Sequence, residues 1–124
     1  MIEADEYDNM FHGLRPQTAV ITNVEWDHPD FFPTPRVLGD SFRHFANLLP
    51  ADGLLIACAD DPGAAALAAE QRARGVTTVT YGFSDDAAWT AADLRRGSSG
   101  YRFTIVRGGA PAAEVNLKVP GRHN

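Results

Sequence analysis

Two short segments of this sequence hold side chains that could do metal and phosphate chemistry. The first, Glu3–Asp8, carries four carboxylates within six residues. The second, Asn23–Asp30, adds an amide, three carboxylates and an imidazole. Carboxylate oxygens and imidazole nitrogens are ligands that suit magnesium or manganese. The residue types therefore indicate a candidate metal site, provided that the fold brings the two segments together.

A buried strand is expected to deliver the second segment. The apolar run Ala19–Ile21 is followed directly by the polar loop. This pattern favours a parallel strand, and ligands bind at the carboxyl ends of such strands in open α/β sheets. If residues 2–5 are the end of a neighbouring strand, Glu3 and Asp5 share one face and point into the same crevice.

A helix is expected over residues 36–49, after this loop. Thr34 can cap its amino end, and Pro35 occupies the first helical position, where its missing N–H is tolerated. Apolar side chains recur at helical spacing along the segment and give it one apolar face.

The following elements predict a mainly parallel sheet flanked by helices. Strands are expected over residues 54–59 and 76–81. Between them lies an alanine-rich helix that Asp61 caps and that Gly75 ends. Strand, helix, strand, helix, strand is the order of a parallel α/β fold.

The pattern changes in residues 83–119. Short alternating runs separated by glycine-rich turns predict a small antiparallel sheet appended near the C-terminus. We assign Trp89, Tyr101, Phe103 and Ile105 to the packing of that sheet. The expected organisation is one domain fragment, 1–124, with a parallel α/β part, 1–82, and an antiparallel part, 83–119.

Composition excludes several classes of function. The 124 residues suit one domain, and the net charge of −5 without a basic block argues against nucleic acid and anionic membranes as partners. No apolar run approaches the roughly 18 residues that span a bilayer. The acidic N-terminus does not have the pattern of a secretory signal. The single Cys58 lies in an apolar run and is interpreted as a packed thiol, so we expect a cytoplasmic protein.

Five motifs occur in one order and carry a resemblance to a known family. They are Glu3–Asp8, Thr22–Asp30, Asp60–Pro62, Thr80–Gly82 and Pro120–Asn124. Together they resemble the ATP-binding central domain of the Mur ligases of peptidoglycan synthesis. The resemblance covers essentially the whole chain.

The resemblance implies a mechanism and a set of site residues. Mur ligases use ATP to turn a substrate carboxylate into an acyl phosphate, which an amino group then attacks. Glu3 matches the glutamate that holds one magnesium ion, and His28 matches the histidine that helps hold a second. These two residues are therefore the expected catalytic and metal-binding residues. Asn124 matches the asparagine beside the adenine, and we group His123 and Asn23 with it as ATP-binding residues.

Each of these residues has a simpler interpretation when taken alone. An acidic cluster is most often a solvated face, and a histidine after a strand most often forms a loop hydrogen bond. Asp60 and Asp61 are interpreted as helix caps. We interpret His12 and His44 as structural.

Two departures from the family pattern bear on the extent of the chain and on the branch of the family that it resembles. No Gly-x-x-x-x-Gly-Lys-Ser/Thr loop is present, and the only lysine is Lys118. In the family this loop precedes the position of Glu3, so we expect the chain to be a piece of a longer protein. Several branches also carry a carbamoylated lysine about fifteen residues after the histidine, and the matching region, Ser41–His44, has none.

The second departure favours the branch that joins L-alanine to UDP-N-acetylmuramate, or the tripeptide-recycling ligase close to it, over the branches that add later residues. The ligase that attaches recycled tripeptide to UDP-N-acetylmuramate is the alternative within the family. Outside it, the same carboxylates and histidine could belong to a metal-dependent hydrolase domain or to a non-catalytic domain.

Overall fold

The sheet of this protein is mixed, and its strand order follows the sequence from β1 to β6. The computed structural model describes residues 1–98 and 100–119. Its parallel strands are β1 (Thr18–Ile21), β2 (Leu54–Cys58) and β3 (Thr77–Gly82). The strands that pair antiparallel are β4 (Trp89–Gly97), β5 (Gly100–Arg107) and β6 (Ala110–Leu117). The helices are the 3₁₀-helix η1 (Tyr7–Gly13), α1 (Pro35–Asn47) and α2 (Pro62–Ala73).

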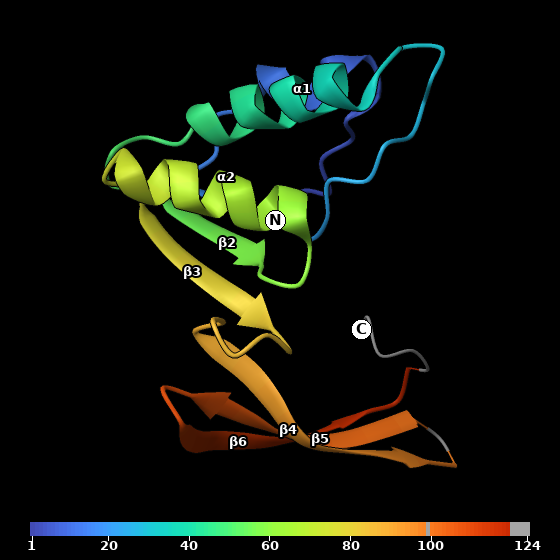
Figure 1. Cartoon of the computed structure of the whole chain (residues 1–124), viewed down its shortest axis with the longest axis vertical. Coiled ribbons are helices and arrows are strands. Elements are labelled where there is room, and N and C mark those ends of the chain that lie inside the picture. Colours follow the sequence, from blue (N-terminus) through green and yellow to red (C-terminus); the bar gives the residue numbers. More distant parts are fainter. Residues whose placement is uncertain (99, 120–124) are drawn as a thin grey trace.

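Figure 1 shows α1 and α2 lying side by side over the parallel strands, with β4–β6 extending away from this layer. The predicted mainly parallel sheet with an antiparallel part near the C-terminus is confirmed. None of the helices in the described ranges is long and apolar enough to cross a membrane.

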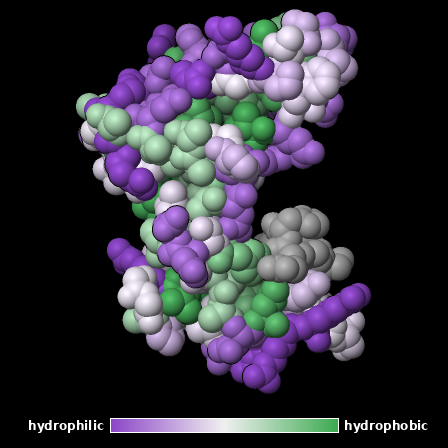
Figure 2. All heavy atoms as spheres, viewed as in Figure 1, coloured by the Kyte–Doolittle hydropathy of each residue, from purple (hydrophilic) through white to green (hydrophobic). Residues whose placement is uncertain are grey.

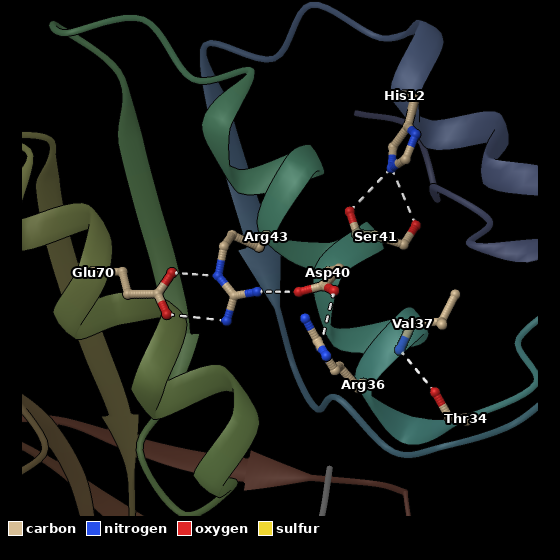
Figure 3. A network of polar contacts seen from close by, with 8 residues as sticks. All are labelled: His12, Thr34, Arg36, Val37, Asp40, Ser41, Arg43 and Glu70. Atoms are coloured by element: carbon tan, nitrogen blue, oxygen red, sulfur yellow. Dashed lines mark hydrogen bonds and ion pairs between the residues drawn. The ribbon is translucent and has the colours of Figure 1, made fainter.

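The residues predicted to start α1 and to end α2 do so in the structure. The Thr34 hydroxyl accepts a hydrogen bond from the Val37 N–H at 3.3 Å, and Pro35 is the first residue of α1. This cap is drawn in Figure 3. After α2, Gly75 has a φ of +85°, the left-handed conformation that ends many helices.

The core lies between the two helices and one face of the parallel strands. Ala19 and Ile21 of β1 are buried, whereas Val20 between them is 56% exposed. Leu55 and Ala57 of β2 continue the buried face. From the helices, the buried side chains that cover this face include Phe45, Ala46, Ala64 and Leu67. The alternation therefore places the apolar face of the strands under the helices.

Polar contacts join the elements of the helical layer (Figure 3). The Arg43 guanidinium on α1 donates from Nε to Glu70 Oε2 on α2 at 2.8 Å, and its Nη1 contacts Asp40. On the other side of α1, His12 Nε2 lies 3.0 Å from the Ser41 carbonyl oxygen, which ties η1 to the helix. Exposed ion pairs of this kind contribute little stability, so apolar packing holds the layer together and these contacts orient it.

The expectation that residues 2–5 end a strand is wrong. Residues 1–6 form no helix or strand, and β1 pairs only with β2 among the described strands. The Asp5 carboxylate accepts a hydrogen bond from the Tyr7 N–H at 2.9 Å, and the Asp5 carbonyl accepts one from Phe11. These bonds turn the chain into η1, so local side-chain bonding replaces strand pairing here.

Few residue pairs join the strands β4–β6 to the strands β1–β3. Only Tyr81–Trp89 and Gly82–Thr90 pair β3 with β4. The Asp60 carboxylate supports this junction, because it accepts hydrogen bonds from the N–H groups of Phe83 and Ser84. A Cβ on Gly82 would lie 2.7 Å from Asp60 Oδ1, so glycine lets the carboxylate approach the backbone. Asp60 is thus a cap for the turn after β3, whereas the helix cap is Asp61.

Asp61 makes two backbone contacts from one oxygen. Its Oδ1 accepts the Ala64 N–H at 2.7 Å, which caps α2, and the Val24 N–H at 3.1 Å, which fixes the loop after β1. The confirmed helix cap is therefore also the anchor of the Asn23–Asp30 loop.

This double role gives a stability prediction. We expect Asp61→Ala to lower the free energy of unfolding by about 1–2 kcal/mol, because both N–H groups lose their acceptor. Thr34→Ala is the matched control, since Thr34 caps α1 with one longer bond, and we expect it to lose about 0.5–1 kcal/mol. Urea unfolding of the three proteins measures the difference. Equal losses in the two variants would show that the contact with Val24 adds no stability.

Candidate functional site

The N-terminal segment and the loop after β1 line one open groove of about 1160 Å³. Glu3 and Glu6 reach it from the N-terminal segment, and Asn23 and Asp27 reach it from the loop. Glu3 and Asn23 of the predicted site therefore both line this groove, although no strand delivers Glu3. Asp5 does not line this groove, and Glu6 takes the place that alternation had predicted for it.

His28 lies beside this groove rather than on its wall. Its Nε2 is 3.5 Å from Glu6 Oε1 and 3.9 Å from Asp27 Oδ2. Both of these carboxylates line the groove, so His28 is one side chain away from it. The backbone of His28 has a φ of +53°, an uncommon conformation for a residue with a side chain.

Hydrogen bonds hold the His28 backbone in that conformation. Its N–H donates to Asp27 Oδ1 at 2.7 Å, and its carbonyl accepts from the N–H groups of Phe31 and Phe32. The Trp26 indole donates to the Phe32 carbonyl at 2.9 Å and closes the same loop. The loop after β1 is thus a bonded turn with His28 at its bend.

Sequence reasoning missed a contact between the two acidic segments. The Tyr7 hydroxyl donates a hydrogen bond to Asp30 Oδ2 at 3.0 Å. This bond and the charge of the carboxylate raise the pKa of Tyr7 above its ordinary value of 10.0, so the hydroxyl is a donor at neutral pH. Tyr7 stood within the first motif, but its aromatic side chain gave no local signal of a partner 23 residues away.

The carboxylates on this groove fit magnesium that is bound by few protein ligands. Among residues 1–98 and 100–119, no group of three or more His, Cys, Asp or Glu side chains is arranged to hold a metal ion. In sites of phosphoryl transfer, however, one or two carboxylates bind magnesium while water and phosphate oxygens complete the shell. The Glu3 and Asp27 carboxylates on the groove provide that smaller number of ligands.

A second, mostly apolar cavity of about 810 Å³ lies between the parallel and antiparallel parts. Trp89, Tyr101, Phe103 and Ile105, assigned from the sequence to sheet packing, line it. Figure 2 shows a narrow waist between the two parts, with apolar residues gathered over the antiparallel strands beside it. Asn23 lines both cavities, so it stands between the polar groove and the apolar one.

Two predicted ATP-binding residues, His123 and Asn124, lie outside the described residues. Their assignment remains a prediction.

The sequence profile of the Mur ligase middle domain matches residues 1–124, the whole chain. The chain belongs to the Mur ligase family. The resemblance drawn from the five motifs is therefore confirmed.

Individual members of the Mur ligase family resemble the chain along its length. The UDP-N-acetylmuramate–L-alanine ligase of Arthrobacter sp. (strain FB24) is 50% identical over 123 residues, which are 98% of this chain and 25% of that protein. The enzyme of the same name from Frankia alni is 41% identical over 130 residues, which cover 100% of this chain and 22% of that protein. The chain thus spans about a quarter of the length of these relatives.

Solved structures of Mur ligases share the fold. The UDP-N-acetylmuramate–alanine ligase of Thermotoga maritima aligns with a TM-score of 0.72 and 22% identity, over 93% of this chain and 24% of that one. The UDP-N-acetylmuramate:L-alanyl-γ-D-glutamyl-meso-diaminopimelate ligase of Neisseria meningitides has a TM-score of 0.73 and 22% identity, over 92% of this chain and 33% of that one. At these identities the comparison supports the fold alone.

Tyr81 gives a pH-dependent prediction for the apolar cavity. Burial raises the pKa of the Tyr81 hydroxyl above 10.0, and the neighbouring Cys58 and Asp60 groups raise it further. The folded protein therefore holds this proton more tightly than the unfolded chain does. The resulting stabilisation is complete below a pH of about 10 and is lost as pH rises through the raised pKa.

Ultraviolet titration of tyrosinate in the wild-type protein and in Tyr81→Phe isolates this group by difference. We expect the difference curve to have its midpoint above 10.0, the ordinary value for tyrosine. A midpoint at or below the ordinary value would contradict the placement of Tyr81 in a desolvated wall.

Proposed function

We propose that this chain is part of the ATP-binding domain of a ligase that joins L-alanine to UDP-N-acetylmuramate in peptidoglycan synthesis. The single observation that carries the proposal is the 50% identity, over 98% of this chain, to a relative with that name. The chain lacks a lysine in the Ser41–His44 region, which supports this ligase or the tripeptide-recycling ligase over the branches that add later residues. The reaction would belong to the full-length protein. This chain spans about a quarter of the length of the relative.

The proposed reaction has two steps. The γ-phosphoryl group of ATP passes to the carboxylate of UDP-N-acetylmuramate, which gives an acyl phosphate and ADP. The amino group of L-alanine then attacks the acyl carbon, the amide bond forms and phosphate leaves. Bound magnesium would neutralise the negative charge that gathers on the phosphate oxygens during transfer.

In this proposal, residues of the polar groove hold the ions and the nucleotide. Glu3 would bind one magnesium ion through its carboxylate, and its position on the groove supports this role. His28 would hold a second ion, which its neutral imidazole can do through one nitrogen. Asn23, His123 and Asn124 are proposed to contact ATP, with Asn124 beside the adenine. A cytoplasmic location is proposed as well, and the free thiol of Cys58 is compatible with a reducing compartment.

The ligase for recycled tripeptide remains the alternative within the family. The relatives that match this chain at 50% and 41% identity are both named for L-alanine ligation. These names favour the alanine-adding enzyme over the recycling ligase, and over the metal-dependent hydrolase and the non-catalytic domain. A phosphate-binding loop encoded directly upstream of Met1 would strengthen the choice of a ligase over the last two.

The experiment that tests the function uses the full-length enzyme. We expect Glu3→Ala and His28→Ala each to lower the rate of L-alanine ligation by at least about 100-fold, because each removes a proposed magnesium ligand. Product formation and phosphate release are measured with UDP-N-acetylmuramate, L-alanine, ATP and saturating magnesium.

Glu114→Ala and His44→Ala are the matched controls. Both side chains are exposed and neither lines the groove. We expect them to retain wild-type rates. Near-normal turnover in Glu3→Ala or His28→Ala would refute the assigned roles, and a wild-type enzyme that prefers tripeptide to L-alanine would refute the proposed substrate.

A further inference from the structure

Tyr7 connects the two acidic segments at the place where His28 stands. Its hydroxyl donates to Asp30 Oδ2 at 3.0 Å, across 23 positions of sequence. Its ring lies edge-on to the His28 imidazole, with ring centroids 4.9 Å apart and planes at 64°. The Tyr7 ring also lies near the Phe31 ring, with centroids 5.8 Å apart. One aromatic side chain therefore packs on the imidazole while a hydrogen bond fixes its far end.

The His28 backbone is already held by the turn, which leaves the orientation of the ring to be determined. Three hydrogen bonds to the N–H and carbonyl of His28, one from its N–H to the Asp27 carboxylate and two from the Phe31 and Phe32 N–H groups to its carbonyl, support the φ of +53°. They do not restrict rotation of the imidazole about its χ angles. The contacts of the imidazole itself are with the Tyr7 ring and with two carboxylates, Glu6 Oε1 at 3.5 Å and Asp27 Oδ2 at 3.9 Å from Nε2.

The strained backbone of His28 indicates that the orientation of its side chain matters for function. A positive φ at a residue other than glycine is unfavourable by about 1–3 kcal/mol and persists where surrounding contacts over-determine it. Here the turn bonds and the Tyr7 contact meet at the same residue. A metal ligand must be held close to its productive angle, because a loose side chain loses affinity to rotational entropy.

We propose that Tyr7, fixed by its hydrogen bond to Asp30, is a positioning residue that sets the plane of the His28 imidazole against the polar groove. The inference rests on the proposed function and deepens it. Tyr7 itself touches no reacting atom and acts through His28. Asp30 has the supporting role of the acceptor that keeps the Tyr7 ring in place.

The hydrogen bond and the ring contact can be separated by substitution. Tyr7→Phe keeps the ring and removes the donor, and Asp30→Ala removes the acceptor. Asp30→Asn keeps an acceptor oxygen at the same place and removes only the charge. If the hydrogen bond positions the ring, Asp30→Asn retains function while Tyr7→Phe and Asp30→Ala lose it.

The first measurement is steady-state ligation by the full-length enzyme as magnesium is varied. We expect Tyr7→Phe and Asp30→Ala each to raise the magnesium concentration for half-maximal rate by about 10-fold, the usual effect of removing a group that orients a ligand. The KM values for L-alanine and UDP-N-acetylmuramate should stay unchanged. Asp30→Asn should stay close to wild type, and the double variant should be no worse than either single one, since both remove the same bond.

The second measurement does not depend on activity. In full-length protein labelled with ¹³C-histidine, the His28 ring signals are assigned by their loss in His28→Gln. We expect them to be shifted by the Tyr7 ring in the wild type and in Asp30→Asn. In Tyr7→Phe and Asp30→Ala they should move toward the shifts of a mobile histidine. Melting temperatures of all variants show whether each remains folded.

The outcomes separate the two proposals. Wild-type magnesium dependence and unchanged His28 signals in both Tyr7→Phe and Asp30→Ala would overturn the positioning role while leaving the ligase intact. Normal ligation by His28→Ala would instead overturn the metal-binding role that the proposed function gives to His28. In that case the ring signals would still report whether Tyr7 orients His28.

Discussion

One carboxylate oxygen links the helical layer of this protein to the loop that holds its candidate site. Asp61 Oδ1 accepts the N–H of Ala64, at the start of α2, and the N–H of Val24, in the loop after β1. These two hydrogen bonds fix the position of the loop relative to the start of α2. Close packing enforces it, because a Cβ on Gly63 would lie 2.6 Å from Val24 Cβ. The position of every downstream loop residue, His28 included, depends on this attachment.

The loop attached in this way meets the N-terminal segment at a groove with several carboxylates on its walls. Four carboxylates, those of Glu3, Glu6, Glu25 and Asp27, line this groove against one guanidinium, that of Arg15, so the groove favours a bound cation. On the other side of Asn23 lies the cavity whose walls are largely apolar and aromatic. A site for a nucleotide needs both environments, because its phosphates require cations and its base packs against apolar surface. The arrangement around Asn23 supports the proposed nucleotide domain for this reason.

Much of the fold could be predicted from the sequence because its signals are local. Thr34, Gly75 and the cap that Asp61 makes on Ala64 act within a few residues, and the alternation in β1 and β2 reports which face is buried. The prediction of a strand end at residues 2–5 was wrong because the Asp5 carboxylate accepts a hydrogen bond from the Tyr7 N–H. The alternation of residue types cannot reveal such a competing local bond.

The missed features depend on contacts distant in sequence. β3 and β4 pair through two residue pairs only, and the aromatic residues of β4 and β5 line a cavity with the same alternation that packing would give. For the site, the five ordered motifs selected Glu3, Asn23 and His28. Residue types alone could not show that Tyr7 reaches Asp30, because a tyrosine in an acidic segment is compatible with many partners.

The central claim is that the groove between the N-terminal segment and the loop after β1 holds the metal ions of a ligase. Anomalous diffraction from manganese in crystals of the full-length protein, grown with a non-hydrolysable ATP analogue, tests it most directly. The account predicts a manganese peak at coordination distance from a Glu3 carboxylate oxygen and one at that distance from a His28 ring nitrogen. Manganese bound to the analogue with both Glu3 and His28 beyond coordination distance would contradict the account.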